Sequence, residues 1–399
     1  MVRLGVVGHG DRVSHVIKYP MREVEPDLAV VGIVDPDEEG ARSRVAEQDR
    51  TDVVFYTSLD EMVRKAKLDA VLIGTRCNLH APYAIEAAKY DLPLFLEKPV
   101  ATSMDQAIAL EEAFQNSRCR VVVSFPLRVS PLCELARQRL TEGVVGSPEH
   151  VLAVNYVPYG TGYYDGGYRV YSVTQGLFLQ KATHDFDYLS YLMSSNIVRV
   201  TATASWGRIF GGNKPAGLVC SQCAESYTCL ESPQNRKRNL SGGTTEDHPC
   251  LFSVDIGTPE SGMNEDSSSA LLEFASGARG VYTQVFYSRR DAATRGATIS
   301  GYHGTLSFDW YTNQMKVVHH HAPFTEAIQG AEGMGHFGGD LQLACNFIDV
   351  IHGRSPSKTP IWAGIQSVYA CLAAKESSEA QRFVEVRQVA ALPSRQGAL

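Results

Sequence analysis

Two closely spaced glycines follow a short apolar run near the start of the sequence. The segment Gly8-His9-Gly10-Asp11-Arg12-Val13 reads G-x-G-x-x-V. In the dinucleotide-binding fingerprint, the first glycine permits a tight turn and the second lets the backbone approach a pyrophosphate. Val13 takes the place of the third small residue, so helix and strand should lie slightly further apart. Residues 8–12 are therefore candidates for binding a dinucleotide, and an ordinary strand–turn–helix is the alternative.

An acidic residue ends the next apolar run. Asp35 follows Val34 and lies 27 positions after Gly8. A carboxylate at this place can accept hydrogen bonds from the adenosine ribose hydroxyls, and it would repel the 2′-phosphate of NADP. No lysine or arginine follows it directly. Asp35 could also begin a helix as its N-cap, and the two roles are compatible. We predict NAD as the cofactor.

A lysine stands between apolar residues at the end of the fifth apolar run. Lys98 is flanked by Leu94-Phe95-Leu96 on one side and Pro99-Val100 on the other. A lysine that is desolvated, or that lies beside another cation, loses its proton more readily. Hydride transfer from a secondary alcohol to NAD+ needs such a base for the hydroxyl proton. We predict that Lys98 is catalytic and contacts both cofactor and substrate. A solvated surface lysine is the alternative that its apolar flanks disfavour.

A histidine at a helix start is the second acid–base candidate. His184 lies in Lys181-Ala182-Thr183-His184-Asp185-Phe186-Asp187. Helical spacing would place Lys181, His184 and Asp187 along one side. By itself this segment favours a capping or core histidine over a catalytic one. If His184 is catalytic, Lys181 should lie close to the substrate.

The elements that position these residues alternate between short apolar runs and helical patterns. This alternation predicts βαβ units and a doubly wound parallel sheet, a Rossmann domain over residues 1–124. Capping boxes begin two of the helices, at Ser58 and Ser103. Because the carboxyl ends of the strands face the ligand crevice, the glycines, Asp35 and Lys98 should meet there. The predicted strands are Arg3–Val7, Leu28–Val34, Val53–Tyr56, Ala70–Ile73, Leu94–Leu96 and Arg120–Val123.

Residues 125–399 are predicted to form a second α/β domain. Alternating apolar and polar residues with glycine turns indicate a large open, mostly antiparallel sheet. Amphipathic helices should cover Asp340–His352 and Trp362–Ala380. The predicted strands are Ala270–Ala275, Arg279–Tyr287, Arg295–Ser300, Gly304–Phe308 and Gln314–Val318.

A cysteine-rich insertion interrupts the second domain at about residues 214–267. Cys220-x-x-Cys223 with Cys229 six residues on has the spacing of a metal clip, and Cys250 or His248 could complete it. A loop with reduced, inert thiols is the alternative. Because nothing in the predicted chemistry needs a metal, we expect none and regard a structural zinc as the less favoured outcome.

Composition excludes several classes of protein. The 399 residues carry 37 Lys+Arg against 44 Asp+Glu, which gives a formal charge of -7. The chain therefore lacks the excess of basic residues that is typical of nucleic-acid-binding proteins. No apolar run is long enough to cross a membrane, and the first residues have no leader pattern. Nine cysteines, an odd number, argue for reduced thiols. We expect a soluble, cytoplasmic protein.

Two further segments make the pattern specific. Thr75-Arg76-Cys77-Asn78-Leu79-His80 follows the fourth strand, and Glu97-Lys98-Pro99 follows the fifth. In this order, and with the glycine turn, they resemble the glucose–fructose oxidoreductase / inositol dehydrogenase / MocA family, which carries T-P-N-x-x-H and E-K-P there. The resemblance continues at Arg128 with Pro131, Gly143–Gly146, His184–Asp187, Glu273–Gly277 and Gly301–Leu306.

The resemblance implies an NAD-dependent oxidoreductase that converts a ring secondary hydroxyl of a sugar, glycoside or cyclitol to a ketone, or the reverse. It implies a homodimer or homotetramer, with Lys98 and His184 as the acid–base pair. Many members carry Asp four residues before the histidine, where this chain has Gln180. It also places Thr75, Asn78, His80 and Glu97 at the cofactor. Residues suited to sugar binding are Arg128, Tyr156, Tyr163 and Arg169, with His336 a weaker candidate.

Two other functions remain open. Some relatives hold NAD tightly and cleave glycosides through a transient keto-sugar. A non-catalytic NAD-binding protein is the other reading, which the presence of both Lys98 and His184 disfavours.

Overall fold

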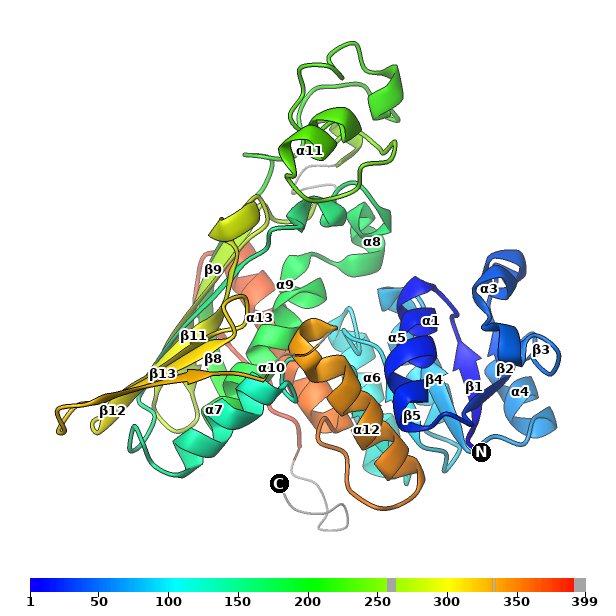
Figure 1. Ribbon diagram of the computed structural model, residues 1–399, viewed down its shortest axis with the longest axis horizontal. Helices are drawn as coiled ribbons and strands as arrows, with labels where there is room; N and C mark the ends of the chain where they lie inside the picture. Colours follow the sequence, from blue (N-terminus) through cyan, green and yellow to red (C-terminus); the bar gives the residue numbers. More distant parts are fainter. Residues whose placement is uncertain (257–262, 332, 334, 391–399) are drawn as a thin grey trace.

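The computed structural model describes residues 1–256, 263–331, 333 and 335–390. Its two β-sheets lie at opposite sides of the molecule with helices between them (Figure 1). The last part of the predicted insertion, residues 257–262, and residues 391–399 lie outside the described chain.

The N-terminal sheet is parallel, with strand order β3-β2-β1-β4-β5-β6. This is the order of a doubly wound Rossmann fold, and it confirms the predicted class. Ser58 and Ser103 cap their helices as expected, by accepting hydrogen bonds from the amides of Glu61 and Gln106. The strands are β1 (Arg3–Val7), β2 (Ala29–Val34), β3 (Val54–Phe55), β4 (Ala70–Ile73), β5 (Leu94–Leu96) and β6 (Val121–Val123). The helices are α1 (Asp11–Val16), α2 (Arg22–Val24), α3 (Glu38–Arg44), α4 (Leu59–Lys65), α5 (His80–Ala87) and α6 (Met104–Gln115).

The C-terminal sheet is open and mostly antiparallel, as predicted. In the described residues it has nine strands in the order β14-β13-β12-β11-β7-β10-β9-β8-β15. Sequence analysis missed β7, which sits in the middle and pairs parallel with β10, so two antiparallel groups replace the expected single meander. The strands are β7 (His150–Tyr156), β8 (Ile197–Ser205), β9 (Ser267–Phe274), β10 (Arg279–Val285), β11 (Thr294–Ser300), β12 (Gly304–Asp309), β13 (Gln314–His319), β14 (Thr325–Gln329) and β15 (Val384–Glu385).

In the part of the chain that the structure describes, helices cover one face of this sheet. Helices α7 (Pro131–Thr141), α10 (Ala182–Leu192) and α13 (Ile361–Ala380) lie between it and the N-terminal domain (Figure 1). The other face bears Leu152 and Leu271, which are 45% and 51% exposed. A hollow of about 650 Å³ lies on this open face, lined by residues of β7 and β11–β14.

The C-terminal chain returns to the Rossmann domain through α12 (Gly339–Ile351). Phe347 packs edge-on against Phe95 of β5 with ring centroids 5.4 Å apart, and Leu343 joins the core formed with Val13. Because this helix supplies part of the N-terminal core, the two domains share one hydrophobic interior at this point, and α12 places its first residues at the crevice.

The insertion projects from the end of the C-terminal sheet, where α11 (Pro233–Asn239) is labelled at the top of Figure 1. The insertion follows β8 in the chain, whereas the short helices α8 (Tyr171–Thr174) and α9 (Leu177–Gln180) lie between β7 and α10. None of the helices in the described ranges is long and apolar enough to cross a membrane.

Candidate active site

The glycine turn after β1 leaves room where a dinucleotide is expected. Gly8 has φ +81, and a Cβ there would lie 2.7 Å from the backbone of Thr75, so only glycine fits. A Cβ at Gly10 would meet no atom within 4 Å. Val13 packs instead against Gly74 after β4, where a Cβ would come within 2.0 Å of the Val13 side chain. Gly74, at the end of the neighbouring strand β4, is thus the small residue that makes room for the Val13 side chain.

Asp35 closes this turn. Its Oδ2 accepts from the His9 amide at 2.7 Å, and its Oδ1 accepts from the Asp37 amide at 2.9 Å. Asp37, and not Asp35, caps α3 by accepting from the Gly40 amide. Asp35 is therefore held at the carboxyl end of β2 with its carboxylate directed to the glycine loop, as an NAD site requires.

The loops after β4 and β5 are tied together by one buried histidine. His80 lies within hydrogen-bond distance of the carbonyl oxygens of Pro99 (Nδ1, 2.8 Å) and Thr75 (Nε2, 3.0 Å). Both ring nitrogens are therefore engaged, and His80 positions the loops that carry Thr75 and Lys98. Asn78 Oδ1 is buried and has no hydrogen-bond partner within the described chain, so an acceptor is available for a bound group.

Arg12 joins the two domains at the crevice. Its guanidinium donates to both carboxylate oxygens of Asp340 at 2.8 and 2.6 Å and to Glu97 at 3.3 Å. The Asp340 carboxylate also lies 3.0 Å from His336 Nδ1, and these partners hold the pKa of Asp340 well below its usual range although burial opposes them. Ser124 donates to Glu97 at 3.0 Å. Arg12 and Glu97 are thus engaged in an ion-pair network at the base of the crevice.

Lys98 follows β5 and is half-buried. Its Nζ donates to the carbonyl oxygen of Gln180 at 2.8 Å, across the boundary between the domains. Burial lowers the pKa of Lys98 to about 8, and the neighbouring cations Lys181 and Arg12 act in the same direction against Cys77 and Glu97. An amine with this pKa is a usable base near neutral pH.

His184 lies beside Lys98 in the first turn of α10. It is 5% exposed, its Nδ1 has no partner in the described residues, and its ring is 5.9 Å from that of Phe125 and 6.2 Å from that of His336. Burial, and then the cations Lys98 and Arg295, push the pKa of His184 well below its usual value. His184 therefore presents a neutral imidazole whose Nδ1 is buried without a hydrogen-bond partner among the described residues.

Lys181 is buried and bound to a tyrosine that sequence analysis missed. Its Nζ donates to the Tyr159 hydroxyl at 2.8 Å and lies 4.9 Å from the centre of that ring and 5.8 Å from that of Tyr163. Burial lowers the pKa of Lys181. The only signal for Tyr159 was its place just after β7, a strand that was itself not predicted. Predicted residues Tyr163 and Lys181 are thus brought to one place.

An ion pair beneath α10 fixes the orientation of His184. Asp185 accepts two hydrogen bonds from Arg295 of β11, both at 2.9 Å, and one each from Asn155 of β7 and Tyr282 of β10, also at 2.9 Å. All four side chains are buried. The paired hydrogen bonds from Arg295, together with those from Asn155 and Tyr282, anchor the start of α10 to β11, β7 and β10.

Three predicted substrate residues are placed elsewhere. One Arg128 nitrogen donates to the buried Asp187 at 2.7 Å, and the guanidinium stacks on Tyr191, whereas Arg128 Nε has no hydrogen-bond partner in the described residues. Arg169 pairs with Asp255 of the insertion at 3.2 Å. Tyr156 lies on the open sheet face with Leu152 and Val154, since alternate strand residues point to opposite sides and Asn155 faces α10. The structure therefore places Tyr156 on the face away from α10, and its contact with substrate stays a prediction.

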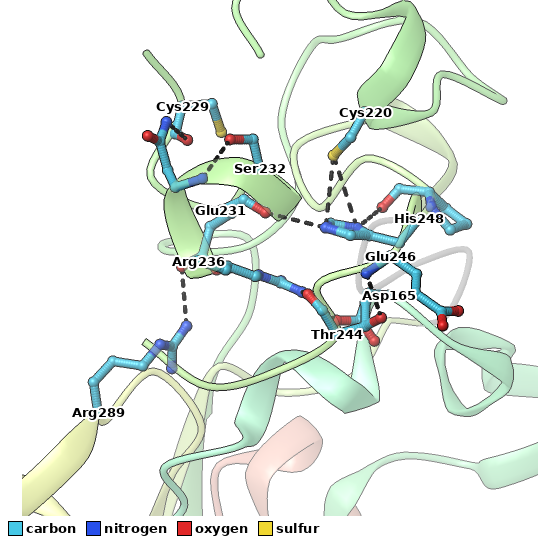
Figure 2. Close-up of polar contacts among 12 residues, drawn as sticks. Asp165, Cys220, Cys229, Glu231, Ser232, Arg236, Thr244, Glu246, His248 and Arg289 are labelled. Atoms are coloured by element: carbon cyan, nitrogen blue, oxygen red, sulfur yellow. Dashed lines mark hydrogen bonds and ion pairs between the residues drawn. The ribbon is translucent and has the colours of Figure 1, made fainter. Parts of the chain in front are cut away.

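The insertion is held to the segment that carries Tyr159 and Tyr163 through a buried arginine. Figure 2 shows Arg236 donating to Asp165 at 2.8 Å and to Glu231 at 3.2 Å, and Glu231 also accepts from Arg289 at 2.9 Å. Arg236 is 1% exposed.

The cysteines of the insertion are free thiols. The Cys220 sulfur lies 3.6 Å from His248 Nε2 (Figure 2). Within the described ranges, no group of three or more His, Cys, Asp or Glu side chains is arranged to hold a metal ion. The prediction that Cys220, Cys223, Cys229 and Cys250 bind no metal stays a prediction.

Comparison with known proteins decides the family. Residues 2–125 match the model of an oxidoreductase family with an NAD-binding Rossmann fold, and residues 133–307 match the GFO/IDH/MocA C-terminal domain. The chain belongs to the Gfo/Idh/MocA family of oxidoreductases. Its N-terminal domain is the NAD-binding domain of this family, and its cofactor is NAD.

The curated relatives of this Gfo/Idh/MocA protein match part of its length. The scyllo-inositol 2-dehydrogenase (NAD(+)) of Bacillus subtilis is 26% identical over 179 residues, 43% of this chain and 47% of the relative. The inositol 2-dehydrogenase of Corynebacterium glutamicum is 25% identical over 203 residues, 50% of this chain and 56% of the relative. The chain thus spans about half the length of these relatives.

Solved structures confirm the fold over nearly the whole chain. Levoglucosan dehydrogenase in complex with NADH and levoglucosan superposes with a TM-score of 0.74 at 17% identity, covering 97% of this chain and 100% of that one. An oxidoreductase domain protein from Kribbella flavida gives 0.74 at 16% identity, with 97% and 100% covered.

Proposed function

We propose that this protein oxidises a ring secondary hydroxyl of a sugar, glycoside or cyclitol to a ketone, or catalyses the reverse reduction, with Lys98 and His184 as the acid–base pair. The observation that carries the proposal is the placement of Lys98. Its amine lies at the carboxyl end of β5 and bonds to the Gln180 carbonyl of the other domain. Its lowered pKa makes it able to take a proton from an alcohol.

The residues around the proposed hydroxyl site have separate tasks. Bound NAD+ would accept the hydride from the carbinol carbon. Lys98 takes the hydroxyl proton. His184, kept neutral by burial and by its cationic neighbours, hydrogen-bonds the reacting oxygen and shares the proton transfer. The Asp185–Arg295 pair holds α10 so that the imidazole keeps its place.

A polyol suits the unpaired polar atoms of the site. Gln180 Oε1, His184 Nδ1 and Asn78 Oδ1 are buried without hydrogen-bond partners among the described residues. Buried acceptors of this kind cost free energy unless a donor reaches them. Ring hydroxyls are such donors, and the ring of Tyr159, which is 45% exposed, offers an apolar surface to the C–H face of a sugar. The names of the inositol and levoglucosan dehydrogenases among its relatives agree with this class.

A spectrophotometric screen tests the proposal. Purified protein is given NAD+ with sugars, glycosides, cyclitols and amino sugars, and NADH formation is recorded. We expect steady NADH formation with at least one ring polyol. Glycoside cleavage without net NADH would contradict net oxidation and favour the redox-cycled glycosidase. NAD binding without turnover on any member of the panel would favour a non-catalytic NAD-binding protein.

The assembly and location belong to the same proposal. The uncovered sheet face, with exposed Leu152 and Leu271 and its hollow, offers a surface for a second copy of this chain, so we propose a homodimer or homotetramer. The nine free thiols are the form expected in a reducing cytoplasm. Light scattering tests the assembly, and a monomer at working concentration would contradict it.

A further inference from the structure

The acid–base pair of the proposed function is enclosed, so the proton taken from the substrate needs a way out. His184 is 5% exposed, and Lys98 is half-buried with its Nζ bonded to a carbonyl. The His184 imidazole does not retain a second proton, because burial and the nearby cations Lys98, Arg295 and Lys181 disfavour a positive charge on the ring. Lys98 must nevertheless be free of its extra proton before the next oxidation.

Tyr159 has the position and the chemistry for this task. It is 45% exposed, whereas its partner Lys181 is 5% exposed, so the phenol lies between a buried ammonium and solvent. Lys181 Nζ donates to the Tyr159 oxygen at 2.8 Å, and Lys98 Nζ donates to the carbonyl oxygen of the preceding residue, Gln180, so consecutive residues just before α10 bind the phenol and the amine. Lys181 thus holds the phenol hydroxyl at the edge of the enclosed site.

The surroundings of Tyr159 favour its ionised form. The cations Lys181, Arg295 and Lys98 lower the pKa of the Tyr159 phenol and together outweigh the effect of burial. The other ionisable groups that face it are the phenols of Tyr163 and Tyr311, both with raised pKa, and Asp185, which is paired with Arg295. A phenolate stabilised by a lysine can accept a proton and pass it on.

We propose that Tyr159, held in place by Lys181, is the proton-relay residue through which Lys98 loses to solvent the proton taken from the substrate. This inference rests on the proposed function. During oxidation the carbinol C–H bond breaks and its hydride goes to the nicotinamide cofactor. The O–H bond breaks, its proton forms an N–H bond on Lys98, and the C=O bond forms. The proton then moves from Lys98 to the Tyr159 oxygen, directly or through one water, and the Tyr159 O–H bond releases a proton to bulk water.

Tyr159→Phe tests the relay because it removes only the hydroxyl and leaves the ring against Lys181. We expect kcat for oxidation at neutral pH to fall about 10²-fold, with NAD binding unchanged. Added small bases such as imidazole should restore the rate in proportion to their concentration. A matched control is Tyr302→Phe, at a 75% exposed tyrosine beyond β11, which should behave as wild type. Normal turnover of Tyr159→Phe, or a loss that no buffer base restores, would overturn the relay.

His336 is the competing exit, because its ring is 6.2 Å from that of His184 and its side chain is 38% exposed. Its Nδ1 is occupied by Asp340, so we expect His336→Asn to show no buffer rescue. Buffer rescue in His336→Asn and not in Tyr159→Phe would assign the relay to His336 and overturn the assignment of Tyr159.

A second measurement tests the Tyr159–Lys181 pair without the need for enzyme turnover. Ultraviolet titration of phenolate absorbance in the cofactor-free protein should show one tyrosine that ionises below the ordinary tyrosine range. Tyr159→Phe should lack this step, and Lys181→Met should move it to higher pH. A titration that is the same in all three proteins would show that the pair does not lower the phenol pKa. If none of the ring polyols supports NAD+ reduction by the wild type, the proposed function is wrong. The titration decides separately whether Lys181 lowers the pKa of the Tyr159 phenol.

Discussion

The rate of oxidation should follow the ionisation of Lys98. Its pKa of about 8 lies 2.5 units below the ordinary 10.5. At pH 7 about one molecule in ten then carries the neutral amine, against about one in 3,000 for an unperturbed lysine, a gain of about 300-fold in active base. Because oxidation needs the neutral amine, kcat should rise about tenfold per pH unit below 8 and level off above it. Ketone reduction needs the ammonium, so its rate should fall above pH 8.

The variants Lys98→Arg and Lys98→Met distinguish a need for proton transfer by residue 98 from a need for its positive charge. Arginine keeps the positive charge but is not deprotonated in proteins, and methionine keeps the apolar stem. Both should lower kcat by about 10²–10⁴ and abolish the inflection near pH 8. Initial rates of NADH formation against pH give the profile, and NADH fluorescence checks cofactor binding. Lys89→Arg, at an exposed position after α5, is the control. Near-normal turnover of Lys98→Met, or a wild-type inflection at the ordinary pKa of lysine, would refute the reasoning.

Four further predictions concern the cofactor, the second catalytic residue, the stability of the insertion and its metal content. Asp35→Ser should lower kcat/KM for NAD+ and raise it for NADP+, because a close carboxylate opposes the 2′-phosphate by several kcal/mol; a wild type with equal kcat/KM for both cofactors would contradict this. His184→Ala should slow oxidation, and combined with Lys98→Met it should cost less than the product of the two single effects if they share one proton path. Independent, multiplicative losses would argue against a shared path. Arg236→Met should lower Tm, since it leaves Asp165 and Glu231 without their buried cation. Elemental analysis should find no stoichiometric zinc, and a chelator that abolished activity in the folded protein would show that the insertion's cysteines matter for hydride transfer.

Much of the Rossmann domain could be predicted because its signals are local. Ser58 and Ser103 each bond within their own first turn, and Gly8 occupies a turn that no other residue fits. These features depend on residues a few positions apart, so their spacing is visible in the sequence. The prediction of Asp35 at the glycine loop also follows, because a strand end fixes where the next side chain lies.

The substrate side could be predicted only in part because its contacts are long-range. Tyr159 meets Lys181, and Arg295 meets Asp185, through the pairing of β7 with β10 and β11, which no local pattern encodes. Without β7, the face on which Tyr156 lies could not be predicted, because a displacement of one residue moves a side chain to the opposite face of a sheet. Arg128 was proposed for sugar binding from its residue type, and its ion pair with Asp187 could not be predicted because it depends on side-chain packing and not on spacing.

The central claim is hydride transfer from a ring carbon with Lys98 taking the proton. The most direct test uses a ring polyol that the wild type oxidises, carrying deuterium on the carbon that becomes the ketone. The account predicts that wild-type protein transfers this deuterium to C4 of the nicotinamide, detected by mass spectrometry of the reduced cofactor, and that Lys98→Met does so about 10²–10⁴-fold more slowly. Deuterium that is lost to water, or that appears in the reduced cofactor at the wild-type rate with Lys98→Met, would contradict it.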